Sequence, residues 1–337
     1  MKQRLTIKTV LLLITFPGFT YAQDPSFSQF FSSPLNINPA LTANINEKWR
    51  MVTNFRDQWI GPASPYATGT VSFDSKIMTD QLPESNVLGL GGMLMYDYAM
   101  SGIHKSVYGS VDISYNVTLA SAGGDHRLGI GVGGIYANKR IEFHRLSFPE
   151  QFTGNGFDTN LPTGEDALMN MKPYFSSSTG ITYSYTNDRT NVDLGVAVFH
   201  LNKPKQTVLD DPHQYLAMRK VVHGNFETYL NDNYLLDLNG IYQYQSGASY
   251  FSIGGALGMF IGETGEDEVF YVGAWYWSNN AIVPYVGLRY KTWQVGLTYD
   301  ITVSKLSQAA QKPKTFELSF IIRGDDHKKG LIWCPWK

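Results

Sequence analysis

The sequence predicts an all-β protein, a transmembrane antiparallel up-and-down β-barrel of about 14 strands. First, apolar and polar residues alternate with a period of two along most of the chain. Second, these segments run about nine to fourteen residues, which suits a tilted membrane strand of roughly 9 to 11 residues better than a soluble strand of about five or six. Third, aromatic residues are abundant, at 14%, and charged residues make up only 17%, against a typical value of about 25%.

The chain begins with a signal peptide, predicted over residues 1–22. Lys2, Arg4 and Lys8 precede a short apolar run, and small residues end the segment at Ala22. The apolar run is too short to span a bilayer, which needs roughly 20 apolar residues. We therefore exclude this segment from the fold.

The remaining chain divides into three parts. Residues 23–48, rich in Pro and Asn, form an N-terminal periplasmic segment; residues 49–323 form the barrel; and residues 324–337 form a C-terminal tail. The tail holds Cys334, the only cysteine, so no intramolecular disulfide can form. Its role is left open.

The alternation assigns one face of each strand to lipid and the other to the lumen. The clearest strand has an apolar face made of Val107, Gly109, Val111, Ile113, Tyr115, Val117 and Leu119. The predicted strands are 49–56, 66–76, 87–99, 105–119, 126–139, 172–186, 191–199, 219–230, 234–245, 250–262, 268–277, 281–291, 293–300 and 315–323. Their even number is typical of bacterial outer-membrane barrels.

The connections between strands support the same interpretation. If the N-terminus is periplasmic, the odd-numbered connections are extracellular, and they include the three longest, 140–171, 200–218 and 301–314. Most even-numbered connections are tight, as at 231–233. Short turns inside and long loops outside are the rule for outer-membrane barrels, which predicts a bacterial outer-membrane location.

Several function classes are disfavoured by composition and spacing. A net charge of -2 gives no electrostatic case for nucleic-acid binding. No segment after residue 22 is long and apolar enough for a membrane helix. The G-x-G-x-x-G pattern at 129–134 continues as a strand where a dinucleotide site needs a helix, so strand glycines that relieve crowding are the better account. We expect no cofactor.

Catalytic and metal-binding signals are weak. His144 and Ser147, in a predicted loop, are the nearest local nucleophile and base, without a third residue to orient them. We expect the protein not to be an enzyme and to hold no metal.

A polar network is predicted inside the barrel. Its residues share inward faces of two neighbouring strands, and they are His223, Asn225, Glu227, Asp237 and Asn239. A metal or catalytic site is the alternative interpretation of the first three. Glu227 and Asp237 would be opposite each other, which is unfavourable for like charges unless cations lie near. The arginines expected to point inward are Arg50, Arg56 and Arg289.

An ordered set of motifs resembles a known family. They are an N-terminal aromatic element, an N-P-A element, an R-x-Q-W element, a Gly-rich third strand that ends near Asp97, and the terminal Cys-Pro-aromatic at 334–336. The residues of the first three motifs are Phe27, Gln29, Phe30, Asn38, Pro39, Ala40, Arg56, Gln58 and Trp59. In this order they resemble the PorP/SprF family of type IX secretion system membrane proteins, over essentially the whole mature chain.

The resemblance implies a function. It implies a non-catalytic outer-membrane barrel in a Bacteroidetes-type envelope, surrounded by outer-membrane lipid. The barrel would work with other type IX secretion components in the export or surface attachment of a cognate secreted protein, such as a gliding adhesin. It does not identify that partner or the oligomeric state. The alternatives are a passive outer-membrane channel or small-solute transporter, and, third, an outer-membrane enzyme.

Two segments are candidates for binding a partner. The connection 140–171 is too apolar for a merely solvated loop, and its candidate partner-binding residues are Phe143, Leu146, Phe148, Phe152, Phe157 and Leu161. The alternative is that they fold inward and cap the barrel. In the N-terminal segment, Phe27, Phe30 and Phe31 plug the lumen, bind a periplasmic partner or simply lead into the first strand.

Overall fold

The computed structural model describes residues 24–61, 66–83, 85–120, 123–164, 172–206, 214–261, 268–308 and 311–324. The predicted signal peptide, and the tail beyond residue 324 with Cys334, lie outside the described residues.

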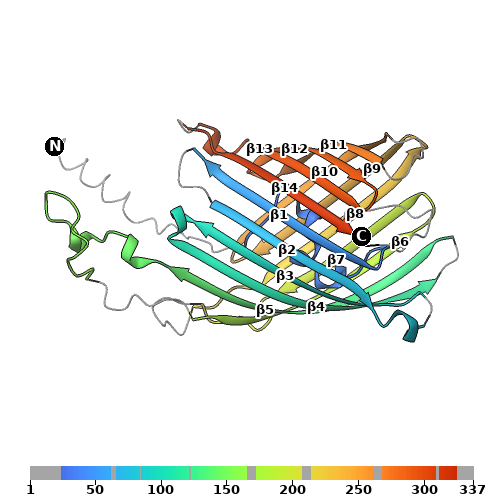
Figure 1. Cartoon of the computed structure of the whole chain (residues 1–337), viewed down its shortest axis with the longest axis horizontal. Coiled ribbons are helices and arrows are strands. Elements are labelled where there is room, and N and C mark those ends of the chain that lie inside the picture. Colours follow the sequence, from blue (N-terminus) through green and yellow to red (C-terminus); the bar gives the residue numbers. More distant parts are fainter. Residues whose placement is uncertain are drawn as a thin grey trace, which may run out of the picture.

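The described residues form a closed antiparallel barrel in which each strand pairs with its neighbours in sequence and the first pairs with the last (Figure 1). The strands are β1 (Trp49–Ile60), β2 (Tyr66–Ile77), β3 (Val87–Ala99), β4 (His104–Ala120), β5 (Asp125–Ile141), β6 (Tyr174–Thr186), β7 (Thr190–Phe199), β8 (Arg219–Asn231), β9 (Tyr234–Gln245), β10 (Ala248–Phe260), β11 (Glu268–Trp277), β12 (Ala281–Tyr290), β13 (Trp293–Thr302) and β14 (Lys314–Arg323). The predicted fold class is confirmed. The largest difference in strand position is in β1, which runs on to Ile60.

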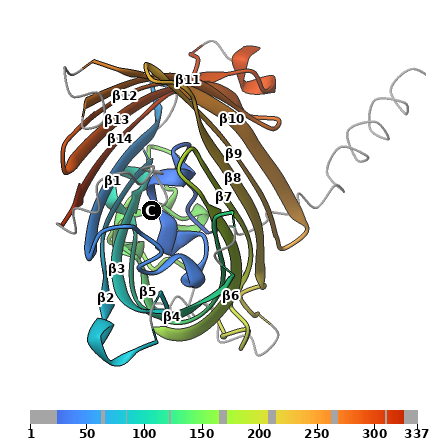
Figure 2. The same cartoon turned by 90° about the vertical axis from the view of Figure 1, so that its right-hand side faces the viewer.

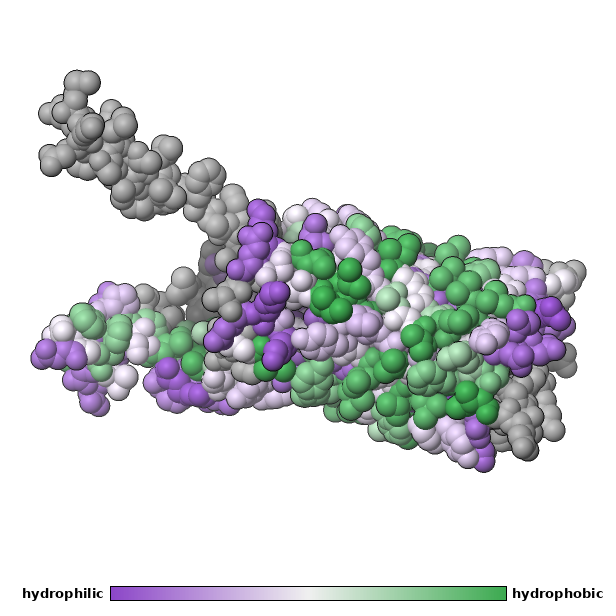
Figure 3. All heavy atoms as spheres, turned by 90° about the horizontal axis from the view of Figure 1, so that it is seen from above, coloured by the Kyte–Doolittle hydropathy of each residue, from purple (hydrophilic) through white to green (hydrophobic). Residues whose placement is uncertain are grey.

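The predicted alternation of faces is also found. On β4, Val111 and Ile113 are exposed on the outside, whereas Asp112 and Ser114 are buried on the inside. Apolar surface runs along the side of the barrel (Figure 3). A closed sheet pairs its backbone amides and carbonyls without water, which is what a strand protein in lipid requires. No helix among the described residues is long and apolar enough to cross a membrane.

The two ends of the barrel differ. One end carries the connections that follow odd-numbered strands, and we call it the long-connection end. β4 and β5 are the longest strands, at 17 residues each, and the connection that follows β5 projects beyond the barrel (Figure 1). The other end, the short-turn end, has tight turns such as 187–189, 232–233 and 291–292.

The lumen is filled by residues 24–48, which we call the plug (Figure 2). The plug contains three short 3-10 helices, η1 (Phe30–Ser32), η2 (Pro34–Asn36) and η3 (Pro39–Leu41). Nearly all of its side chains are buried. These residues therefore lie inside the barrel, which differs from the periplasmic position expected for this segment.

Two apolar clusters join the plug to the wall. In the first, the ring of Phe31 lies 4.7 Å from that of Trp275 and 5.5 Å from that of Tyr285, measured between centroids. In the second, Phe27 and Leu35 pack with side chains of β3 to β6. The plug aromatics thus form the core of the barrel, because the lumen wall alone is largely polar.

Candidate functional site

The N-P-A element forms a capped turn in the plug. Asn38 caps η3, and its side-chain Oδ1 accepts a hydrogen bond from the backbone N–H of Ala40 at 2.8 Å. Pro39 occupies the first position of η3, where a missing N–H costs nothing. Thr42 Oγ1 donates to the Pro39 carbonyl at 2.8 Å and closes the turn.

The same asparagine ties the turn to the wall. Its Nδ2 donates to the carbonyls of Ile181 and Val196, each at 3.2 Å, and lies 3.0 Å from Nε2 of His223. The turn packs directly against the backbone of Gly131 on β5, because a Cβ added there would collide with the backbone of η3. Gly131 of the G-x-G-x-x-G pattern therefore serves close packing of the plug against the sheet.

A buried ion pair holds the plug near the short-turn end. Nε and Nη2 of Arg50 donate to the two oxygens of Asp74 at 3.0 and 2.8 Å, and both side chains are fully buried. Asp74 Oδ2 also accepts the backbone N–H of Ala43 at 2.7 Å, and Arg50 donates to the Leu41 carbonyl at 3.2 Å. Plug backbone groups thus complete the hydrogen bonds of a buried charge pair.

A second ionic group holds the start of the plug. Arg56 donates to Asp300 at 3.0 Å and to Glu317 at 3.3 Å. Glu317 also accepts the backbone N–H groups of Ser28 and Gln29 at 2.8 and 2.9 Å, and the Ser28 hydroxyl donates to Asp300 at 2.8 Å. Charge-assisted bonds to backbone N–H groups of this kind are strong and directional.

A chain of hydrogen bonds anchors the plug at the long-connection end. His200 Nε2 lies 2.7 Å from Asp24 Oδ2, and Ser176 Oγ lies 2.7 Å from His200 Nδ1. Arg219 Nε is 3.3 Å from the same carboxylate oxygen. Burial raises the pKa of Asp24, but the charges of His200 and Arg219 and the histidine hydrogen bond outweigh it and hold this pKa well below its usual range.

Ser176, His200 and Asp24 are hydrogen-bonded in the same sequence, serine to histidine to aspartate, as the residues of a serine hydrolase triad. However, Ser176 has no exposed surface, so a substrate has no access to its hydroxyl. The chain of hydrogen bonds instead fixes the first described residue of the plug to the barrel wall.

The predicted polar network lies inside the barrel. All five of its residues, His223, Asn225, Glu227, Asp237 and Asn239, are buried on inward faces. Glu227 is opposite Asp237, and Asn225 is opposite Asn239, as expected from the turn. Asn239 donates to Asp237 at 3.1 Å and accepts the indole N–H of Trp275. Within the described part of the chain, no group of three or more acidic, histidine or cysteine side chains is arranged to hold a metal ion.

Most of the N-terminal motif residues gather in the lumen. Those that are buried there, next to or within the plug, are Phe27, Gln29, Phe30, Asn38, Pro39, Ala40 and Arg56. Gln58 accepts a hydrogen bond from Arg56 Nε at 3.3 Å. Trp59 does not join them, since it is half exposed at the end of β1 with a left-handed backbone of φ 64°.

The candidate partner-binding residues form a structured projection. Phe152 and Phe157 are bridged by backbone pairing, their rings lie 5.2 Å apart, and they are 56% and 55% exposed. Leu161 is also exposed. Phe143, Leu146 and Phe148 are only partly exposed, so the apolar surface is concentrated on three of the six predicted residues.

A buried glutamine orders this projection. Gln151 is 3% exposed, its Nε2 donates to the Leu161 carbonyl at 2.9 Å, and its Oε1 accepts the Phe148 N–H at 3.1 Å. The Asp158 N–H donates to the Gln151 carbonyl at 2.8 Å. We call residues 146–161 the aromatic knob, because this folded segment presents the Phe152–Phe157 pair.

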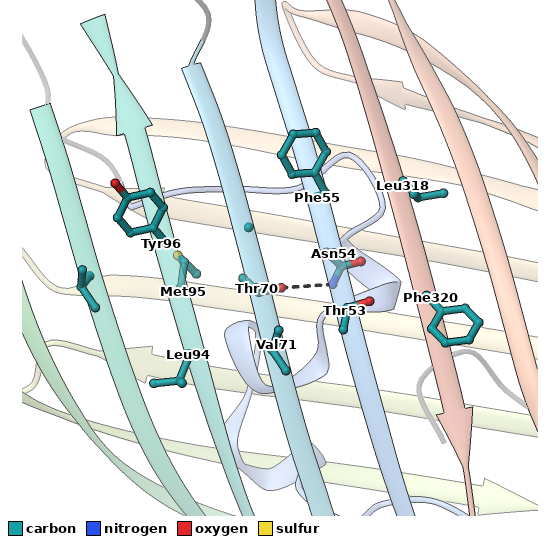
Figure 4. Close-up of a pocket in the computed structure, with 12 residues that line it drawn as sticks. Thr53, Asn54, Phe55, Thr70, Val71, Leu94, Met95, Tyr96, Leu318 and Phe320 are labelled. Carbon is teal, nitrogen blue, oxygen red and sulfur yellow. Dashed lines mark hydrogen bonds between the residues drawn. The ribbon is translucent and has the colours of Figure 1, made fainter. Parts of the chain in front are cut away.

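A groove of about 550 Å³ lies on the outer, lipid-facing side of the wall (Figure 4). It centres on Gly69, which is paired with Phe55 on one side and Tyr96 on the other. Because Gly69 lacks a side chain, the apolar belt is interrupted there. The groove is apolar and contains no candidate functional residue.

Sequence reasoning missed the residues that hold the plug in the barrel. On the wall side they are Asp74, Ser176, His200, Arg219, Asp300 and Glu317, and in the plug itself they are Asp24 and Ser28. A signal was present, because Asp74, Asp300 and Glu317 each fall on the polar face of a predicted strand. What it did not reveal is that these carboxylates accept hydrogen bonds from residues 24–48: Asp74 and Glu317 accept backbone N–H groups, and Asp300 accepts the Ser28 hydroxyl.

Fold and site together define a membrane β-barrel whose lumen is occupied by its own N-terminal segment. The chain matches the family model described as type IX secretion system membrane protein PorP/SprF over residues 19–322. It belongs to the PorP/SprF family, as its motifs predicted.

Solved structures with low sequence identity share the fold. The Ralstonia pickettii toluene transporter TbuX matches with a TM-score of 0.52 and 11% identity, over 91% of this chain and 96% of that one. A deletion mutant of the TodX monoaromatic hydrocarbon channel matches with a TM-score of 0.52 and 9% identity, over 88% and 94%. The comparison with curated proteins finds no match.

Proposed function

We propose that this protein is a non-catalytic barrel of the bacterial outer membrane. In this role it serves the type IX secretion machinery by holding a cognate secreted protein or adhesin, during export or at the cell surface. Membership of the PorP/SprF family supports a role with type IX secretion components. The specific role in docking rests on the structure of the plug and of the aromatic knob.

The observation that carries the proposal is the contrast between a filled lumen and an ordered projection. The plug is held at both ends and along its length by buried hydrogen bonds and ion pairs. Outside, Phe152 and Phe157 remain more than half exposed on a folded segment. Exposed aromatic side chains held rigidly are typical of binding surfaces, because their ordering costs little entropy on binding.

The knob indicates the chemistry of its partner. Glu150 lies in the short 3-10 helix Pro149–Gln151, two residues before Phe152, and Asp158 directly follows Phe157. The partner surface would therefore be apolar with basic groups at its edge, since complementary charges favour the correct encounter. With the long-connection end facing outward, the knob is presented to the cell exterior.

Replacing Phe152 and Phe157 together with Ser tests this proposal. The barrel should still shift in mobility on heating in detergent, while the cognate secreted protein should fall at least about tenfold at the cell surface, as expected for removal of two aromatic anchors. Met100→Ser is the control, because Met100 is equally exposed at the same end of the barrel. Unchanged surface attachment in the double variant would place the docking site elsewhere.

A further inference from the structure

The barrel wall has one seam that joins the two ends of the chain. β1 pairs with β14 there, so this junction closes the barrel only after the last strand has formed. The register places Arg50 directly opposite Arg323, and both are buried. Like charges in directly opposed positions are unfavourable. Asp74 and the Leu41 carbonyl of the plug both accept hydrogen bonds from Arg50.

The plug binds the β13–β14 side of this seam through two consecutive residues, Ser28 and Gln29. The Gln29 side chain donates to the Glu317 carbonyl at 3.0 Å and to Thr298 Oγ1 at 3.3 Å, and it accepts from Ser319 Oγ at 2.7 Å. Its backbone N–H donates to the Glu317 carboxylate. Gln29 is fully buried, so these bonds are shielded from water.

The plug binds the β1 side as well. Asn54 Nδ2 donates to the Ser32 carbonyl at 2.7 Å, and the Arg56 guanidinium donates to Ser28 Oγ at 2.6 Å. Asn54 lies on β1 between β2 and β14 (Figure 4). Arg56 crosses the seam to Glu317, its directly paired residue on β14.

We propose that the plug is the clasp that closes the barrel, holding β1 against β14, so that release of its Ser28–Ser32 segment opens the wall at this seam. The plug contacts both sides of this junction with buried, charge-assisted bonds. Elsewhere, neighbouring strands are joined by connections, whereas β1 and β14 lack a direct one. The proposal does not depend on the identity of the secreted partner.

Gln29→Ala tests the clasp, with Asn44→Ala as its matched control. Both are buried plug amides, but Asn44 binds Ser184 and Asp193 on β6 and β7, away from the seam. Hydrogen exchange measured strand by strand should become about tenfold faster in β1 and β14 for Gln29→Ala, a factor that corresponds to about 1.4 kcal/mol. Asn44→Ala should leave β1 and β14 unchanged. Equal acceleration of every strand by Gln29→Ala would overturn the proposal.

A disulfide across the seam gives a second test, which holds even if Gln29→Ala alone does not fold. The pair Val52→Cys and Ile321→Cys joins paired lumen-facing residues of β1 and β14. The control pair, Val221→Cys and Gln243→Cys, joins β8 and β9 in the same way. In a Cys334→Ser background, the seam disulfide should restore a heat-modifiable barrel and slow exchange in the Gln29→Ala variant, and the control should not. Equal rescue by the two pairs, or rescue by neither, would show that the plug does not act at the seam.

Discussion

At the residue scale, Asn38 concentrates the contacts of the plug turn. Asn38→Ala removes the cap of η3 and leaves the Ile181 and Val196 carbonyls without this donor, so we expect a loss of about 2–4 kcal/mol in unfolding free energy. Asn38→Asp keeps the cap acceptor but loses the donors, and it places a carboxylate beside two carbonyls. It should destabilise at least as much as alanine in denaturant unfolding followed by gel mobility. If Asn38→Asp destabilises the protein less than Asn38→Ala does, the cap of η3 contributes more than the hydrogen bonds to the wall.

The Asp24 carboxylate makes the anchoring of the plug depend on pH. Its pKa is depressed in the folded protein, from an unfolded value of about 3.9. The stabilisation is therefore complete above that value and is lost as the pH falls toward the folded pKa. Asp24→Asn should lower unfolding free energy at pH 7 by about 1.5–3 kcal/mol, the usual worth of a hydrogen bond to a charged group. This loss of unfolding free energy should be smaller at pH 3. The control, Asp232→Asn in an exposed turn, should leave the unfolding free energy unchanged at both pH values.

At the scale of elements, inward glycines shape the sheet to receive η3. Gly131→Ala should force the turn off the wall, because its Cβ would meet backbone that cannot rotate away, and we expect a cost of about 1–3 kcal/mol. Gly109→Ala is the control, since its Cβ would point outward and lie 3.5 Å from Leu94, an ordinary contact. Unfolding midpoints compare the two variants, and protease sensitivity of residues 24–48 reports whether the plug has moved. Equal midpoints would mean that the plug tolerates the added methyl group.

The strands could be predicted from the sequence because their alternation is local. A period of two fixes which face each side chain occupies, and it placed Glu227 opposite Asp237 through a short turn. The plug could not be placed in this way, because its partners lie far along the chain, as with Ser28 and Asp300. Its short 3-10 turns also have no periodic pattern. The sequence left three positions open for Phe27, Phe30 and Phe31: inside the lumen, on a periplasmic partner, or in a lead-in to the first strand.

At the scale of the whole molecule, the filled lumen separates a docking function from transport. The pair Ser32→Cys and Asn54→Cys, at positions now joined by a 2.7 Å hydrogen bond, would lock the plug to β1 by a disulfide or a short bifunctional reagent. In a Cys334→Ser background, we expect the locked barrel to display the cognate secreted protein as well as the reduced form does, because docking uses the aromatic knob. Reconstituted into planar bilayers, both forms should pass little ion current. If locking abolishes surface display or solute uptake, and reduction restores it, then the plug must leave the lumen during function, and the protein works as a gated channel.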